Sequence, residues 1–591
     1  MDEAGNRGQV ADLAVTVPPP PPSELAKAGP RTGAAKTGSR VAEQKKLAVF
    51  AVSDMVKVDP VTGWLMLDAD EYRAEDTAGP NPVWDAAAKT VYLTAAANEA
   101  AAFQLILNKL GQALTDVRVS VGDLTGPGGR KIPADPNVQC FRLWYVSAGR
   151  ARRAMDSSWY GEVCLPLRQP FDESLAIPAA DNKVPGQGYQ SVWVDVYVPC
   201  GTAAGDYKGI ITVTAKELTR PATLSLRVKV LPLSLPDKFS WVVELNRYHS
   251  MAGWGGVDPG RQPDQALKTT LDYYRIAHQH RCVVNALPYS HSGRVDGWFI
   301  PVMEGSGTGV RVKDWTDYDR RFGPLLDGSA FSAEAGYVGP GANVPINHMY
   351  MAFHEAWPIW LDKSTYRDWM EVSDRLDFAE YAKKARRPQV AFTDEYKNGF
   401  KAVAAQFFQH FKAKGWTRTS MHFFNNNKYY WKVAYFGGMG RGGVCFWLMD
   451  EPTDFDDYDA NGFVMGLAVQ AHRQAGAPEV LMDGRVDVSQ PDMARGLWDD
   501  IATVWCIGGL RGYPTMTAVR RRWLPHEKHW CYGGGVGVAS APVGLSQSCL
   551  LRWSFGADGY MPWWNCFGGT GAAWQRAENL AIYYSGKNYA N

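Results

Sequence analysis

Two adjacent acidic residues, Asp450 and Glu451, follow an apolar run in the last third of the chain. The run, residues 444–449, leads directly into the two acids, and Pro452 comes next. Two neighbouring carboxylates can perform acid/base chemistry when their surroundings keep one ionised and the other protonated. The alternative is that Asp450 caps a following helix while Glu451 is solvated. The pair is therefore a candidate catalytic pair, and the local pattern leaves both interpretations open.

The apolar run itself predicts the element that positions the pair. Six uninterrupted apolar residues are typical of a strand that is buried on both faces. Pro452 cannot donate to a sheet ladder, and it biases Glu451 toward an extended conformation. We therefore expect the two acids to lie where a buried strand leaves the core, with their side chains pointing to opposite sides.

The composition is that of a folded protein without a strong electrostatic preference. Of 591 residues, 46% are hydrophobic and 21% charged, and 62 basic residues balance 61 acidic ones. A formal net charge of +1 does not indicate binding to nucleic acid or to an anionic membrane. No apolar run approaches the length of a membrane-spanning helix. We expect neither a nucleic-acid nor a membrane partner, and oligomeric state stays open.

Cysteine spacing and short motifs predict no metal or cofactor. Nine cysteines are present, and none forms a CxxC pair, which indicates reduced thiols instead of disulfides or a zinc site. The segment 526–529 is one residue too short for the HExxH helix of a zinc protease. A second acidic pair, Asp394-Glu395, follows Thr393 at the predicted start of a helix. There it fits N-terminal capping better than catalysis.

The chain is expected to have three parts. Residues 1–45 are rich in Pro, Ala and Gly, and predict a disordered arm. They begin with acidic residues and no apolar segment, so they lack a secretory signal and predict the cytoplasm for the chain as written. Residues 46–236 contain short strands between turn residues, which predicts a β-sandwich domain. Residues 237–591 alternate strands with helices and predict a (β/α)8 barrel of the TIM type, so the whole is a multidomain β plus α/β protein.

Nine candidate strands compete for the eight places of the predicted barrel, so at least one is wrong. They are residues 241–245, 282–287, 348–353, 421–424, 444–449, 480–482, 503–507, 530–532 and 559–563. Amphipathic helices are expected at 266–279, 394–414 and 460–475.

Polar and aromatic residues follow several of these strands, and the active sites of such barrels lie at the carboxyl ends of the strands. Each one has an ordinary alternative as a cap, a turn residue or a rim ion pair. Tyr289, His291, Asn426 and Asp487 are among them. The residues that we expect to bind substrate are Asn246, Tyr248, His354, Glu355, Trp357, Asn425, Lys428, Arg485, Trp563, Trp564 and Asn565.

The order of several stretches along the chain resembles a known family. The stretches are residues 98–104, 193–199, 205–209, 448–452, 485–489 and 556–563. From about Leu47 to the end, the chain resembles the glycoside hydrolase family 123 group of β-N-acetylgalactosaminidases, together with related families of unknown function (DUF4091) that share their barrel. It departs from that pattern in lacking an export signal and in ending soon after the last predicted strand, without the usual C-terminal extension.

The resemblance implies retaining hydrolysis of a 2-acetamido-hexoside in an oligosaccharide or glycoconjugate, assisted by the substrate's own acetamido group. Glu451 would act as general acid, Asp450 would stabilise the acetamide's developing positive charge, and Tyr and Trp side chains would hold the sugar ring. Two alternatives remain. One is a carbohydrate-binding or structural protein without turnover. The other is a glycosidase for a sugar without the acetamido group, with Glu355 as nucleophile about 5 Å from Glu451.

Overall fold

The computed structural model describes residues 42–43, 46–68, 71–73, 79–148, 157–360, 387–428, 447–508, 519–534, 537–540, 542–563 and 582–584. Most of the predicted arm lies outside this part of the chain. Its two described residues form β1 (Ala42–Glu43), which pairs antiparallel with β2 (Leu47–Ser53). Within the described residues, no helix is both long enough and apolar enough to cross a membrane.

The N-terminal half of the described chain is built from β-sheets. The first sheet has the order β1, β2, β8 (Glu99–Lys109), β15 (Tyr189–Val198), β12 (Val138–Ser147) and β13 (Trp159–Pro166). The second contains β11 (Lys131–Ile132), β10 (Leu124–Thr125), β16 (Gly205–Thr214), β17 (Ala222–Ser234), β7 (Thr90–Ala97) and β6 (Trp84–Asp85), with β9 (Leu114–Val121) and β14 (Leu175–Ile177) beside them. A third, small sheet joins β3 (Lys57–Val58), β4 (Leu65–Asp68) and β5 (Glu71–Arg73).

Buried and more exposed residues alternate along these strands, and the buried ones form a core between the two large sheets. Val192 and Val194 on β15 are fully buried, as are Leu226 and Val228 on β17, and all four belong to one apolar cluster. A period of two is what a strand with one buried face requires. The predicted β-rich region is therefore confirmed, while the sandwich arrangement and the exact domain boundaries stay predictions.

The second half of the chain forms an eight-stranded parallel sheet that is nearly closed. Its strands are β18 (Val242–Tyr248), β19 (Val283–Leu287), β22 (His348–Tyr350), β23 (Ser420–Phe424), β24 (Met482–Val488), β25 (Val504–Gly508), β26 (Lys528–Gly534) and β27 (Gly559–Trp563). The order runs β19-β18-β27-β26-β25-β24-β23-β22, and every paired neighbour is parallel. At the opening, Asn285 Nδ2 of β19 donates to the carbonyl oxygen of His348 on β22 at 3.2 Å. This arrangement confirms the eight parallel strands of the predicted barrel.

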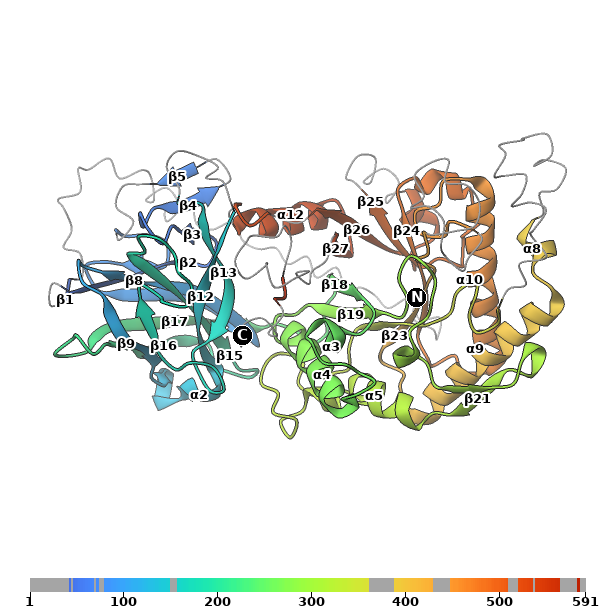
Figure 1. Cartoon of the computed structure of the whole chain (residues 1–591), viewed down its shortest axis with the longest axis horizontal. Helices are drawn as coiled ribbons and strands as arrows, with labels where there is room; N and C mark the ends of the chain where they lie inside the picture. The colour runs from blue at the N-terminus through green and yellow to red at the C-terminus, as the bar shows by residue number, and fades with distance from the viewer. Residues whose placement is uncertain are drawn as a thin grey trace. The chain divides into compact units, whose positions relative to one another are not determined.

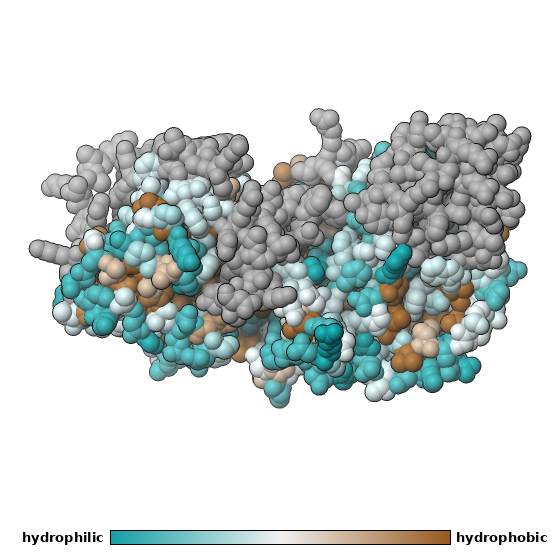
Figure 2. Space-filling view, viewed as in Figure 1, coloured by the Kyte–Doolittle hydropathy of each residue, from teal (hydrophilic) through white to brown (hydrophobic). Residues whose placement is uncertain are grey.

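Helices form at the three predicted positions. They are α4 (Pro263–Gln279), α9 (Asp394–Lys414) and α10 (Phe455–Ala475), and Figure 1 shows α9 and α10 side by side. The Thr393 hydroxyl accepts from the backbone N–H of Tyr396 at 3.2 Å, so the second acidic pair does open a capped helix. On the face drawn in Figure 2, hydrophilic and apolar residues are intermixed, in keeping with the balanced composition. One helix after every strand stays a prediction.

The predicted strand at 444–449 is wrong for its described residues. Trp447 to Met449 are buried, as expected, but β23 pairs directly with β24 and leaves no place between them. Several of their backbone groups bond to side chains instead of to a ladder, which satisfies buried peptide groups equally well. The side-chain bonds include Asn427 Nδ2 to the Trp447 carbonyl (2.6 Å), Asn461 Nδ2 to the Met449 carbonyl (2.9 Å) and the Leu448 N–H to Asp457 Oδ1 (3.0 Å). The Met449 N–H donates to the backbone carbonyl of Asn427 at 3.2 Å. The predicted strand at 480–482 is also misplaced, because β24 begins at Met482.

Charged side chains fill part of the barrel interior. Glu244 on β18 and Arg485 on β24 are both 0% exposed and form an ion pair, and Arg485 Nη2 also lies 3.0 Å from Asp487 Oδ1. Burial alone would raise the pKa of Glu244, but the charge of Arg485 and the His348 hydrogen bond outweigh it and lower that pKa to about 2. A single buried guanidinium group, that of Arg485, therefore neutralises charge on two buried carboxyl groups.

Replacing Arg485 by methionine should destabilise the fold strongly. Because two carboxylates would lose their buried partner, we expect Arg485→Met to lower the free energy of unfolding by about 3–5 kcal/mol. Urea unfolding measures this. Arg311→Met is the control, since Arg311 pairs with Glu304 on the surface, where a loss of less than about 1 kcal/mol is expected. Equal losses in the two variants would contradict a structural role for the buried pair.

Candidate active site

Asp450 and Glu451 both line a pocket beside the carboxyl end of β24. The pocket has a volume of about 150 Å³ and is lined by Lys428, Leu448, Asp450, Glu451, Pro452, Thr453, Ser489 and Gln490. The Asp450 side chain is 3% exposed and that of Glu451 is 29% exposed. One carboxylate is therefore held inside the protein while its neighbour can reach a ligand. No aromatic side chain is among these described lining residues, so the expected aromatic wall is not formed by them.

The backbone turns sharply at Glu451. Its φ is +51°, in the left-handed region that few residues other than glycine adopt, so the extended conformation expected before Pro452 is wrong. The Glu451 N–H donates to the carbonyl oxygen of Asp487 at 3.1 Å, which ties this turn to β24. Such strain persists only where the surroundings hold it, and it clusters at functional sites.

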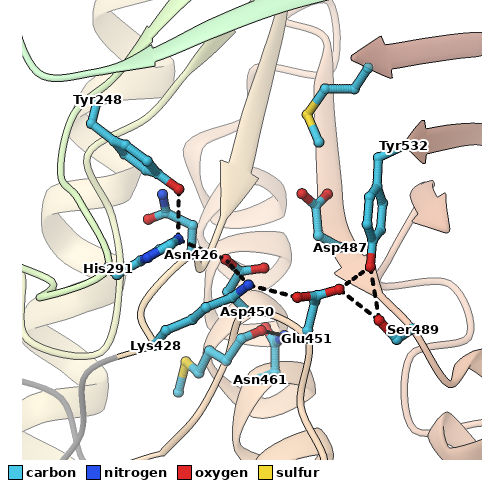
Figure 3. Close-up of polar contacts among 12 residues, drawn as sticks. Tyr248, His291, Asn426, Lys428, Asp450, Glu451, Asn461, Asp487, Ser489 and Tyr532 are labelled. Atoms are coloured by element: carbon cyan, nitrogen blue, oxygen red, sulfur yellow. Dashed lines mark hydrogen bonds and ion pairs between the residues drawn. The ribbon is translucent and has the colours of Figure 1, made fainter. Parts of the chain in front are cut away.

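Both oxygens of the Glu451 carboxylate have hydrogen-bond donors (Figure 3). Oε2 lies 2.6 Å from Lys428 Nζ. Oε1 accepts from the Ser489 hydroxyl at 2.6 Å and from the Tyr532 hydroxyl. Burial alone would raise the pKa of Glu451, but the charge of Lys428 and these hydrogen bonds outweigh it and lower the pKa. Glu451 is therefore ionised in the free protein.

Asp450 lies between two cations or potential cations. Its Oδ2 is 3.4 Å from His291 Nε2 and 3.5 Å from Lys428 Nζ. His291 Nε2 also lies 2.6 Å from the Tyr248 hydroxyl. Burial raises the pKa of Tyr248, and the charges of Asp450 and Asp487 raise it further, so the phenol keeps its proton. The buried Asp450 side chain therefore has two nitrogen atoms within ion-pair distance of one oxygen.

Asp487 is a third carboxyl group near the pair. Arg485 Nε donates to its Oδ1 at 3.1 Å, and the side chain is 5% exposed. Burial, together with the charges of Asp450 and Glu244, raises the pKa of Asp487 to about 7 against the opposing effect of Arg485. Burial therefore favours the protonated form of Asp487 relative to an exposed aspartate.

Some of the residues expected to bind substrate are brought to this site. Lys428 and Tyr248 contact the pair directly or through His291. Asn425 donates to Asn461 at 2.9 Å, and Asn461 holds the Met449 carbonyl beneath the pair. Asn246 lies on β18 with its Nδ2 3.0 Å from Met561 Sδ, a contact that involves neither the pair nor the residues that line the pocket.

Other expected residues lie away from the pocket. His354 and Glu355 are 0% exposed, and burial lowers the pKa of His354 to about 3. Trp357 packs its ring against Phe353 and Phe407 in the apolar core. Arg485 is enclosed in the barrel, as described above. The Trp563 side chain and all of Trp564 and Asn565 lie outside the described residues.

Ser489 and Tyr532 contact Glu451 but were not among the expected residues. Ser489 directly follows β24, and Tyr532 lies near the end of β26. The same strand-end rule that selected the others points to both, although a lone serine or tyrosine there is not distinctive.

A possible cation site lies at the start of α10. Carboxylate oxygens of Asp454, Asp456 and Asp457 are within 4.8 Å of one another. One of them, Asp457 Oδ1, already accepts the Leu448 N–H at 3.0 Å. Acidic residues are favoured at any helix N-terminus, so this cluster alone does not identify a metal site.

Comparison with known proteins gives a family match within the N-terminal half and a structural likeness over most of the chain. The model of the glycoside hydrolase 123 N-terminal domain matches residues 78–215. A solved family 123 glycoside hydrolase from Clostridium perfringens, described for glycolipid glycan hydrolysis, shares 13% identity and a TM-score of 0.53, over 88% of this chain and 78% of that one. At this identity the likeness shows the fold. No curated protein sequence matches the chain.

Two further solved structures are less similar to this chain. A glycosyl hydrolase family 2 member from Bacteroides cellulosilyticus has 9% identity and a TM-score of 0.22, over 82% of this chain and 47% of its own. Beta-glucuronidase 3 from Bacteroides uniformis has 8% identity and a TM-score of 0.23, over 75% and 38%. The family 123 match and the domain model together confirm the resemblance that the sequence motifs indicated.

Proposed function

We propose that this chain, given its confirmed resemblance to glycoside hydrolase family 123, is a retaining glycosidase that cleaves 2-acetamido-hexosides in oligosaccharides or glycoconjugates. The observation that carries the proposal is the difference between two adjacent acids in one pocket. Asp450 is buried and Glu451 is partly exposed, at 3% and 29%. Substrate-assisted hydrolysis needs two such carboxyl groups, one to stabilise charge and one to move a proton.

Each acid has a distinct role in the proposed reaction. The acetamido carbonyl oxygen of the substrate attacks the anomeric carbon while Glu451 protonates the departing oxygen, which leaves an oxazolinium ion. Asp450 stays ionised and offsets the positive charge that develops on the acetamide nitrogen. Water then attacks the anomeric carbon and gives its proton to Glu451, which restores the acid.

Glu451 is ionised in the free protein but must carry a proton to act as an acid, and a movement of Lys428 can account for the change. Nζ lies 2.6 Å from Glu451 Oε2 and 3.5 Å from Asp450 Oδ2, so a small movement transfers the ammonium from one carboxylate to the other. A sugar in the pocket would displace Lys428 toward Asp450. Glu451 would then lose a cation that lowers its pKa and could take up a proton, while Asp450 would gain a closer counter-ion.

Replacing Lys428 by methionine should therefore move the pH profile of kcat/KM, which reports the free enzyme. An acid must be protonated, so activity falls as pH rises through the pKa of Glu451. Removing a neighbouring opposite charge should raise that pKa, and with it the falling limb, by about 1–3 units. Lys397→Met is the control, since Lys397 pairs with Asp394 at the surface at 2.7 Å. An unmoved limb in Lys428→Met would contradict the partner exchange.

A substrate screen tests the proposed function itself. Aryl 2-acetamido-glycosides of the galacto and gluco series should release phenol, and plain galactosides and glucosides should not. Binding of the acetamido sugars without release would instead favour the carbohydrate-binding protein. Release from the plain sugars alone would favour the glycosidase without acetamido chemistry.

That last alternative has less support from the geometry. Glu355, its candidate nucleophile, is 0% exposed and is not among the residues that line the pocket. Its Oε2 lies 3.4 Å from the Trp447 N–H, which is a structural position beneath the pair. A nucleophile has to reach the anomeric carbon, and Glu355 is enclosed away from it.

A further inference from the structure

Two hydroxyl groups converge on one oxygen of Glu451. Ser489 Oγ lies 2.6 Å from Oε1, the Tyr532 hydroxyl also donates to Oε1, and the two hydroxyls are 2.8 Å apart. Each hydroxyl has one hydrogen, and they cannot both donate to each other. Whichever hydroxyl donates to the other, the second one keeps its hydrogen for Oε1. This leaves Oε2 as the oxygen that becomes available when Lys428 moves away.

The position of the Tyr532 ring depends on a glycine in the neighbouring strand. Gly508 on β25 is the register partner of Tyr532 on β26. A Cβ built on Gly508 would lie 2.4 Å from the Tyr532 hydroxyl oxygen and 2.5 Å from the ring carbon that bears it. Real Cβ atoms do not approach that closely, so any side chain at 508 would move the phenol. Glycine inside a strand weakens it and often marks the close approach of another group.

We infer that Tyr532 and Ser489 are positioning residues that fix Oε2 as the proton-carrying oxygen of Glu451, and that Gly508 provides the space this requires. The inference rests on the proposed function, because it assigns a place to the proton of the proposed acid. Tyr532 does not exchange its own proton in this scheme. The proton passes from Oε2 to the leaving oxygen in the first half-reaction and returns to Oε2 from water in the second. Burial and the charge of Glu451 raise the pKa of Tyr532, so the phenol stays a donor throughout.

Tyr532→Phe tests the hydroxyl without removing the ring. Loss of one hydrogen bond to a charged group should lower kcat for substrates with basic leaving groups by about 10- to 100-fold. The same loss should raise the pKa of Glu451 and move the falling limb of kcat/KM to higher pH. Tyr560→Phe is the matched control, since Tyr560 lies on the adjacent strand and donates to the Gly533 carbonyl at 3.5 Å. If the role of Tyr532 were merely structural, the falling limb of kcat/KM would stay at the same pH. An unmoved falling limb together with an unchanged kcat would overturn the inference.

Gly508→Ala tests the origin of the tyrosine position in a double-mutant cycle. Alone, it should lower kcat as Tyr532→Phe does, because the methyl group displaces the phenol. In a Tyr532→Ala background it should have little further effect, because the clash is gone. Thermal unfolding of each variant identifies any that fail to fold, and Tyr532→Phe then carries the test alone. Equal effects of Gly508→Ala in both backgrounds would contradict the proposed link.

A measurement without substrate separates this inference from the proposed function. The pKa of Glu451 can be followed by the ¹³C shift of its carboxyl carbon, assigned by its loss in Glu451→Gln. If that pKa rises in Tyr532→Phe while the wild type hydrolyses no acetamido-glycoside, the positioning role stands and the proposed function fails. If the wild type is active and this pKa is the same in both proteins, the positioning role fails and the proposed function stands.

Discussion

Glu451→Gln should lower kcat/KM for 2-acetamido-glycosides by at least about 10²-fold, as expected for a lost general acid. Glutamine keeps the size of the side chain and an oxygen for the hydroxyls of Ser489 and Tyr532, but it cannot deliver a proton. The loss should be largest for aryl glycosides with basic leaving groups, since an acidic phenol departs without protonation. Steady-state kinetics across a series of leaving groups measures this dependence.

The chain supplies its own control for this variant. Glu395 belongs to the second acidic pair, exposed at the start of α9, and Glu395→Gln should leave kcat/KM unchanged. If Glu451→Gln lost the same factor for acidic and basic leaving groups, Glu451 would not be the acid.

Asp450→Asn is expected to lower kcat by about 10²–10³-fold, the size of effect seen when one preorganised electrostatic partner of a transition state is removed. Asparagine matches the shape of Asp450 but cannot offset the positive charge of the forming oxazolinium ion. Because the oxazolinium ion forms as the aglycone departs, whatever the leaving group, the loss should persist even for acidic leaving groups, in contrast to Glu451→Gln.

Asp394→Asn, in the surface pair, is the matched control and should be silent. An Asp450→Asn enzyme that kept full activity with acidic leaving groups would show that Asp450 does not stabilise the acetamide. Its buried place between His291 and Lys428 would then be structural.

The sequence predicted the barrel well because long, strongly periodic segments carry their own signal. The bounds of α9, from Asp394 to Lys414, are those predicted, since Thr393 marks the start and Gly415 adopts the left-handed conformation after the end. Most strands of the barrel were shifted by only one or a few residues. The exception at β24 arose because its interior residues are charged: Asp483, Arg485 and Asp487 interrupt the apolar pattern that identifies a strand.

The candidate site was located for a reason that proved partly wrong. The apolar run before Asp450 predicts a barrel strand, but burial alone does not distinguish a strand from an irregular segment whose carbonyl groups bond to Asn427 and Asn461. The left-handed turn at Glu451 has no signal in sequence, since Pro452 predicts the opposite conformation. The sequence likewise does not predict that Lys428 lies within reach of both Asp450 and Glu451, because these distances arise only in the folded chain.

The most direct test of substrate-assisted hydrolysis is a crystal soaked with the thiazoline of an N-acetylhexosamine, a stable mimic of the oxazolinium ion. We expect the thiazoline to lie in the pocket with its ring nitrogen against Asp450. Glu451 Oε2 should face the anomeric carbon, and Lys428 should have moved to Asp450. Two results would contradict substrate-assisted hydrolysis at this site. One is a thiazoline bound away from both carboxylates, and the other is an empty pocket in crystals soaked at a high thiazoline concentration.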